Sequence, residues 1–124
     1  MEQSHIWVGV FGPNSPKDYF DEIYDEDNED APVSKFAGDQ GERWIDHDWM
    51  EMSFLNNPID ILELAGNHSY SNYYDVLVSN ACKEVSLDKA NVFIIIDKDE
   101  VKSPKTLKKD DFELHYLGTF NCDV

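Results

Sequence analysis

The chain has 124 residues, of which 26 are acidic and 10 are basic, so its formal net charge is −16 at pH 7. This length supports one domain with a buried core, residues 1–124, and is short for two. Hydrophobic residues make up 41% of the chain, which excludes an intrinsically disordered protein. Nucleic acid is a poor partner for so acidic a chain, because phosphate contacts need clustered Lys and Arg.

The first residues, MEQSHIWVGVF, lack the basic start of a secretion signal, and no apolar run approaches the roughly 20 residues of a membrane span. We therefore expect a cytoplasmic protein without a membrane partner. Cys82 and Cys122 form no CxxC or Cys/His pattern, so neither a disulfide framework nor a zinc site is expected. Cys82 is expected to be packed in the core.

The N-terminal part of the chain predicts a strand followed by a helix. Residues 5–11, HIWVGVF, are aromatic and β-branched and precede a Gly-Pro-Asn turn, which is typical of a strand that ends in a loop. Residues 15–18, SPKD, offer an N-cap, a proline at the first helical position and an acid three residues after the cap. The predicted helix has an acidic back and an apolar face made of Tyr19, Phe20, Ile23 and Tyr24.

The middle of the chain predicts a series of short elements. Residues 31–41 are expected to be irregular, with one helical turn after Ser34. Residues 44–55, WIDHDWMEMSFL, alternate between apolar and polar positions near their end and favour a strand. Two helices are predicted next: a short one from Asn57-Pro58 to Ala65, and a longer one through Cys82 that Ser69 or Ser71 caps.

The C-terminal part predicts two more strands. Residues 90–97, ANVFIIID, indicate a central strand that is covered on both faces. Residues 98–109 are polar and basic and are expected to form a surface loop, and residues 112–120, FELHYLGTF, alternate as a final strand does. This order of elements favours an α+β fold, with a mainly antiparallel or mixed sheet of about four strands and about three helices.

Two of the predicted strands share a pattern. Residues 7–11, WVGVF, and 116–120, YLGTF, each have an aromatic residue, a glycine and a phenylalanine at the same spacing. Two such strands side by side would let each glycine admit the aromatic ring of its neighbour. A chance match explains the pattern equally well, because short strand motifs recur widely.

Asp46, His47 and Asp48 offer two carboxylates around one imidazole, which are ligand types of a metal or acid-base site. In a strand, however, the two carboxylates face one way and the imidazole faces the other. The chain also lacks an EF-hand, an HExxH pairing and a glycine-rich phosphate loop. We therefore expect no catalytic residue, no metal and no cofactor. A small metal-binding or enzymatic domain centred on this triplet remains an alternative.

The charge is concentrated in the first half of the chain: residues 1–63 hold 16 acids and 3 bases, and residues 64–124 hold 10 acids and 7 bases. Residues 18–30, DYFDEIYDEDNED, contain eight acids and no base. Acids near a helix C-terminus oppose the helix dipole and cost about 0.3–1 kcal/mol each, so folding does not explain them. The tract is either a solubility patch or a contact surface for a basic partner.

On the second interpretation, nine acids bind the partner: Asp21, Glu22, Asp25, Glu26, Asp27, Glu29, Asp30, Asp46 and Asp48. Aromatic residues near them would then act as apolar anchors, unless they belong to the core. The candidate anchors are Tyr19, Tyr24, Trp44 and Trp49.

Six stretches, taken in order, carry a resemblance to a known family. They are HIWVGVF, SPKDYFDEIYDED, APVSKFAGDQGERWIDHDWME, NHSYSNYYDVL, ANVFIIID and HYLGTFNCD. Together they resemble the immunity protein 22 family of bacterial polymorphic toxin systems, over nearly the whole chain. Trp7, Gly9, Phe11, the run Asp39-Gln40-Gly41 and the triplet at 46–48 are the recognisable pieces, and they are equally suited to structural roles.

The resemblance implies a small cytoplasmic α+β protein that is not an enzyme and that neutralises a toxin encoded beside it, often a nuclease. It brings no catalytic residue. An acidic face fits such a toxin, because nucleases have basic clefts that bind phosphate. An acidic adaptor protein without a toxin partner remains an alternative.

Overall fold

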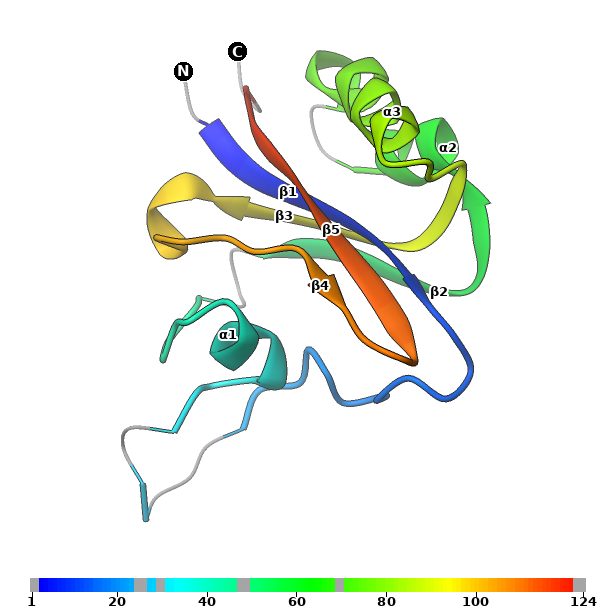
Figure 1. Cartoon of the computed structure of the whole chain (residues 1–124). Coiled ribbons are helices and arrows are strands. Elements are labelled where there is room, and N and C mark those ends of the chain that lie inside the picture. Colours follow the sequence, from blue (N-terminus) through cyan, green and yellow to red (C-terminus); the bar gives the residue numbers. More distant parts are fainter. Residues whose placement is uncertain (1–2, 24–26, 29–30, 47–49, 69–70, 122–124) are drawn as a thin grey trace.

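The computed structural model describes residues 3–23, 27–28, 31–46, 50–68 and 71–121 (Figure 1). Within these residues, five strands form one antiparallel sheet in the order β2-β3-β1-β5-β4. The strands are β1 (Gln3–Phe11), β2 (Glu51–Asp60), β3 (Lys89–Asp97), β4 (Leu107–Lys108) and β5 (Phe112–Asn121). The α-helices are α1 (Lys35–Asp39), α2 (Ile61–Gly66) and α3 (Asp75–Glu84), and 3-10 turns span Ser71–Tyr73 and Lys98–Glu100. The predicted α+β fold is confirmed.

Helices cover both faces of the sheet: α1 lies on one side, and α2 and α3 lie on the other (Figure 1). Strand β3 has neighbours on both edges, and its residues 90–96 are all buried. Its alternate side chains enter two cores, because Ile94 packs in the cluster that contains Phe36 of α1, whereas Phe93 packs with Tyr74 beside α3. The prediction of a central strand covered on both faces is therefore confirmed.

The two strands with the shared pattern, β1 and β5, are neighbours in the sheet. Trp7 lies opposite Tyr116, with their ring centroids 5.3 Å apart. The glycines, however, do not receive each other's aromatic rings. A Cβ atom on Gly9 would lie 2.6 Å from the carbonyl oxygen of Glu113, and Gly118 has φ +120° beside the register shift at Ile6/Trp7. Gly9 therefore allows the backbone of β5 to approach closely, and Gly118 allows the β-bulge in the pairing of β1 with β5.

The predicted helix that begins at residue 15 is wrong: residues 12–23 form turns, a bend and irregular chain. The side chains that would start a helix are bound elsewhere. The Ser15 hydroxyl donates to the carbonyl oxygen of Gly12 at 2.7 Å, and Asp18 pairs with Lys35 at 2.8 Å. The backbone carbonyl of Tyr19 accepts the N–H of Phe36 at 3.1 Å. Contacts with α1 thus replace the internal bonds of a helix.

Several boundaries in the middle of the chain also differ from the prediction. Residues 44–46 are not in a strand, since β2 begins at Glu51. Strand β2 continues to Asp60 and so includes the first four residues of the predicted short helix, because Ile59 and Asp60 pair with β3. The Asp60 carboxylate then caps α2 by accepting the N–H of Leu62 at 3.1 Å.

Other local predictions are confirmed. The helical turn after Ser34 is α1, and the Ser34 hydroxyl accepts the N–H of Ala37 at 3.0 Å. The predicted longer helix is α3, but Ser71 does not cap it as predicted, because Tyr74 occupies the N-cap. Ser69, the other predicted cap, lies outside the described residues. The expected loop at residues 98–109 contains β4, which is the strand that the sequence did not predict.

Cys82 is fully buried, as predicted, and burial raises the pKa of its thiol to about 12. Cys122 lies outside the described residues. None of the helices in the described part of the chain is long and apolar enough to cross a membrane.

Candidate partner-binding surface

The described members of the predicted binding set fall in two places. Asp21, Glu22 and Asp27 are exposed, on the segment that leaves β1 and reaches α1. Around residues 27 and 28 this segment projects away from the sheet, at the lower left of Figure 1. Asp46 is half-buried and lies in the connection from α1 to β2. The other members lie outside the described residues: Asp25, Glu26, Glu29, Asp30 and Asp48.

Backbone hydrogen bonds hold three parts of this region side by side. The N–H of Ile23 donates to the carbonyl of Val33 at 2.6 Å, and the N–H of Val33 donates to the carbonyl of Arg43 at 2.8 Å. Residues 21–23 therefore lie beside residues 31–33, which lie beside residues 42–44. Segments that are distant in the sequence are thereby held side by side.

Two large apolar side chains are exposed on these same segments. Ile23 is 47% exposed and Trp44 is 56% exposed. Tyr19, another candidate anchor, is only 2% exposed and belongs to the core around Phe11 and Phe36. Tyr24 and Trp49 lie outside the described residues. Of the four candidate anchors, Trp44 is thus the one that the structure places at the surface.

Helix α1 fixes the chain just before residues 21–28, which are called the acidic segment below. The Tyr19 hydroxyl donates to the Asp39 carboxylate at 2.7 Å, and burial together with this bond raises the pKa of Tyr19. Lys35 binds Asp18 at 2.8 Å, and this hydrogen bond lowers the pKa of the Asp18 carboxyl. Since that ion pair is half exposed, it orients the segment more than it stabilises the fold.

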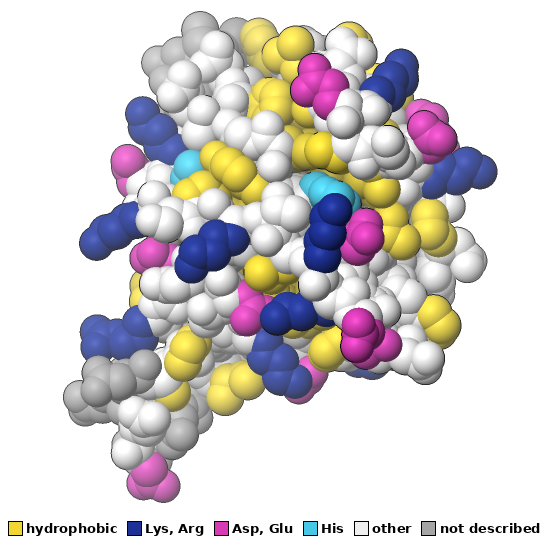
Figure 2. All heavy atoms as spheres, viewed as in Figure 1, with side chains coloured by type: hydrophobic (Ala, Val, Ile, Leu, Met, Phe, Trp, Pro, Cys, Tyr) yellow, Lys and Arg dark blue, Asp and Glu magenta, His cyan; other side chains and the backbone are white. Residues whose placement is uncertain are grey.

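The charge of the surface is not uniform. On the face that carries β4 and β5, Lys and Arg side chains are interleaved with Asp and Glu (Figure 2). Residues 21–28 contain no Lys or Arg, whereas residues 98–109 contain five. A basic partner is therefore attracted to the acidic segment more strongly than to the β4 side of the molecule.

Asp46 of the triplet at residues 46–48 does not lie in a strand as predicted, because β2 begins at Glu51. The backbone N–H of Asp46 donates to the Glu100 carboxylate at 3.4 Å. His47 and Asp48 lie outside the described residues. Among the residues that the structure does describe, no group of three or more His, Cys, Asp and Glu side chains is placed to hold a metal.

Sequence reasoning missed an arrangement around His68, which follows α2. Its Nε2 lies 2.7 Å from the Ser53 hydroxyl, its Nδ1 lies 3.5 Å from the Glu51 carboxylate, and its ring stacks on Phe93 with centroids 4.5 Å apart. This is the order of groups in a serine hydrolase triad. Burial lowers the pKa of His68, against a smaller opposing effect of Glu51. A hydrolase also needs a substrate cavity beside the serine. The cavity described next is lined by neither Ser53 nor His68.

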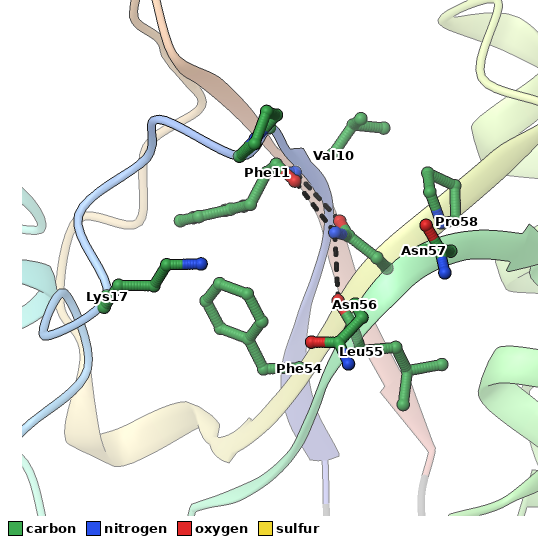
Figure 3. Close-up of a pocket in the computed structure, with 11 residues that line it drawn as sticks. Val10, Phe11, Lys17, Phe54, Leu55, Asn56, Asn57 and Pro58 are labelled. Atoms are coloured by element: carbon green, nitrogen blue, oxygen red, sulfur yellow. Dashed lines mark hydrogen bonds between the residues drawn. The ribbon is translucent and has the colours of Figure 1, made fainter.

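A cavity of about 530 Å³ lies where β1 ends beside β2 (Figure 3). Its apolar walls include Phe11 and Phe54, and its polar rim includes Asn56, Asn57 and Lys17. The pattern of β2 gave no sign of this cavity, because it depends on how β2 pairs with β3. It lies at one end of the same 12–23 segment that carries Asp21 and Glu22 at its other end.

Comparison with known proteins identifies one family. The family model described as Immunity protein 22 matches residues 5–123. No curated protein and no solved structure matches the chain. The family match covers β1 from His5 onward, the other four strands of the sheet and both of its helical layers. The chain therefore belongs to the Immunity protein 22 family.

Proposed function

We propose that this immunity protein neutralises its cognate toxin by binding it through the acidic surface on residues 21–48. The observation that carries the proposal is the exposure of Ile23 and Trp44 on segments that also carry the acids. Interfaces commonly combine a few buried apolar anchors with a polar, charged rim. The proposed contact set is Asp21, Glu22, Asp25, Glu26, Asp27, Glu29, Asp30, Asp46 and Asp48.

The charge of the chain supports a toxin with a basic surface, such as the phosphate-binding cleft of a nuclease. With a net charge of −16, the immunity protein attracts such a cleft over a distance of about 10 Å at 0.1 M salt. Attraction of this kind speeds association, and apolar contacts then slow dissociation. Inhibition by occlusion requires no catalysis, and the toxin would be met in the cytoplasm.

Bacterial growth tests the proposal. Cells that express the toxin encoded beside this gene should grow only when the immunity protein is present and able to bind. Trp44→Ala and Ile23→Ser should each reduce rescue, because they remove exposed apolar contacts without opening the core. Leu62→Ala, at a position that is 43% exposed on α2, is the matched control and should rescue fully.

Binding of purified, catalytically inactive toxin would then locate the surface. Wild type and Leu62→Ala should bind equally, and Trp44→Ala should bind at least tenfold more weakly, as expected for the loss of an aromatic anchor. If Trp44→Ala binds and rescues like wild type, the interface lies elsewhere. If wild type neither binds nor rescues, the acidic adaptor is the better interpretation.

A further inference from the structure

The cavity in Figure 3 exists because the β2–β3 pairing is interrupted. Phe54 pairs with Val92 and Ile59 pairs with Ala90, so four residues of β2 lie opposite Asn91 alone. The side chain of Asn91 fills this interruption. Its Oδ1 accepts the N–H of Phe11 at 2.8 Å, and its Nδ2 donates to the carbonyls of Phe11 at 2.9 Å and Leu55 at 3.1 Å. Asn91 is 1% exposed, so the floor of the cavity is a fixed, fully bonded structure.

The walls of the cavity combine an apolar surface with hydrogen-bond donors. The rings of Phe11 and Phe54 contact each other edge to face, with centroids 5.2 Å apart, and Phe54 remains 39% exposed. The exposed amides of Asn56 and Asn57 form part of the rim on β2. Lys17 reaches into the cavity from the facing 12–20 segment (Figure 3).

Lys17 is available to bind an anion. Among the described residues, its ammonium has no hydrogen bond or ion pair, and the adjacent acid, Asp18, is paired with Lys35 at 2.8 Å. Only three bases occur in residues 1–63, and Lys17 is the one of them that lines this cavity. An ammonium and two amides arranged around an aromatic wall match a carboxylate on an apolar stem.

We infer that this cavity receives an aspartate or glutamate side chain of the toxin, an inference that rests on the proposed function. A free anion is a poorer occupant, because the net charge of −16 lowers the local concentration of anions. A carboxylate that belongs to a toxin already held at the acidic surface is presented at a high effective concentration. The 12–23 segment joins the cavity to that surface, so one partner can occupy both.

Replacement of Lys17 separates this contact from long-range attraction. Lys17→Met makes the protein more acidic, so attraction to a basic toxin alone would leave binding unchanged or strengthen it. A carboxylate in the cavity has the opposite consequence, and Lys17→Met should weaken binding of inactive toxin about tenfold. Asn57→Asp places a carboxylate on the rim that would repel the carboxylate of the toxin, so it should weaken binding as well. Lys102→Met has the same change of charge as Lys17→Met at an exposed loop and should bind like wild type.

A charge-reversal screen identifies the partner residue. Lys17→Glu should bind poorly, and one toxin variant among those with a single exposed Asp or Glu changed to Lys should restore its affinity. Urea unfolding of each variant checks that the fold is kept. If the wild type binds and both Lys17→Met and Asn57→Asp bind equally well, the cavity inference is overturned but the proposed function is not. Absence of wild-type binding would overturn both.

Discussion

Asn91 on β3 binds both main-chain groups of Phe11 on β1, with its Oδ1 2.8 Å from the Phe11 nitrogen and its Nδ2 2.9 Å from the Phe11 oxygen. One amide side chain thereby completes the end of a strand where the regular β1–β3 ladder has already stopped at Gly9 and Val92. A buried asparagine of this kind is structural, because all of its hydrogen bonds serve neighbouring backbone.

Asn91→Ala should therefore be strongly destabilising. It leaves three buried or half-buried backbone groups without their side-chain partner, and we expect a loss of about 2–4 kcal/mol in the free energy of unfolding. Urea denaturation followed by fluorescence measures it. Asn57→Ala, at an exposed position on the same cavity, should change the stability by less than about 0.5 kcal/mol. Equal effects of the two substitutions would contradict the role of Asn91.

A pair of glycine substitutions tests the close approach of β1 and β5. Gly9→Ala places a methyl group 2.6 Å from the carbonyl oxygen of Glu113, and should cost about 1–3 kcal/mol because a backbone must move. Gly66→Ala is the control, since a Cβ at the last residue of α2 meets nothing within 4 Å. It should stabilise the protein by up to about 1 kcal/mol through helix propensity. Thermal unfolding of both variants should give shifts of opposite sign.

His68 should make the protein less stable in acid. Burial lowers its folded-state pKa below the ordinary value of 6.5, so the unfolded chain binds a proton that the folded chain resists. Its contribution to stability is therefore complete above pH 6.5 and falls as the pH drops below that value. Ser53, Glu51 and Phe93 surround the ring, and among them Glu51 alone carries a charge that opposes the shift.

His68→Gln isolates this effect, because glutamine does not titrate. The free energy of unfolding of wild type, minus that of the variant, should decrease between pH 7.5 and pH 5.5 in urea titrations. The carboxylates titrate in both proteins, so their contribution cancels in this difference. A difference that stays constant, or grows in acid, would show that His68 is readily protonated in the folded state.

The acidic segment should control the rate of association with the toxin. Replacing Asp21, Glu22 and Asp27 by Asn, Gln and Asn should lower the association rate constant about tenfold at low salt and flatten its dependence on salt. Stopped-flow measurements at several salt concentrations report both quantities. Neutralising three exposed acids on the other side of the sheet is the matched control: Glu63, Glu84 and Asp88. If both triple variants slow association equally, net charge matters and position does not.

The sequence predicted best those elements whose side chains fill a core. Strand β3 was evident because residues 90–96 are all buried, and the turn of α1 was evident from the Ser34 cap. The helix predicted at residue 15 had the correct local signals and was still wrong. The carboxylate of Asp18 and the backbone carbonyl of Tyr19 are bonded instead to residues of α1 that lie about 17 residues later in the chain. Such long-range contacts leave no local sequence pattern.

The candidate sites also divide into residues that the sequence reveals and contacts that depend on the fold. Exposed acids were recognisable from composition alone, and Trp44 was recognised as a candidate anchor. By contrast, the contact of Ser53 with His68 and the cavity around Lys17 and Asn57 depend on the register of β2 against β3. A single shift of that register reverses which side chains share a face, so no spacing rule finds them.

The pairing of β1 with β5 also determines how the molecule responds to mechanical force. The Gln3 amide donates to the Asn121 side chain at 3.3 Å, at the outer end of two antiparallel strands. Tension applied between these two residues pulls the strands apart from that end, so the inter-strand hydrogen bonds break one after another instead of sharing the load. Force on this axis should unzip the sheet at low tension, whereas thermal unfolding must disrupt both helical layers at once.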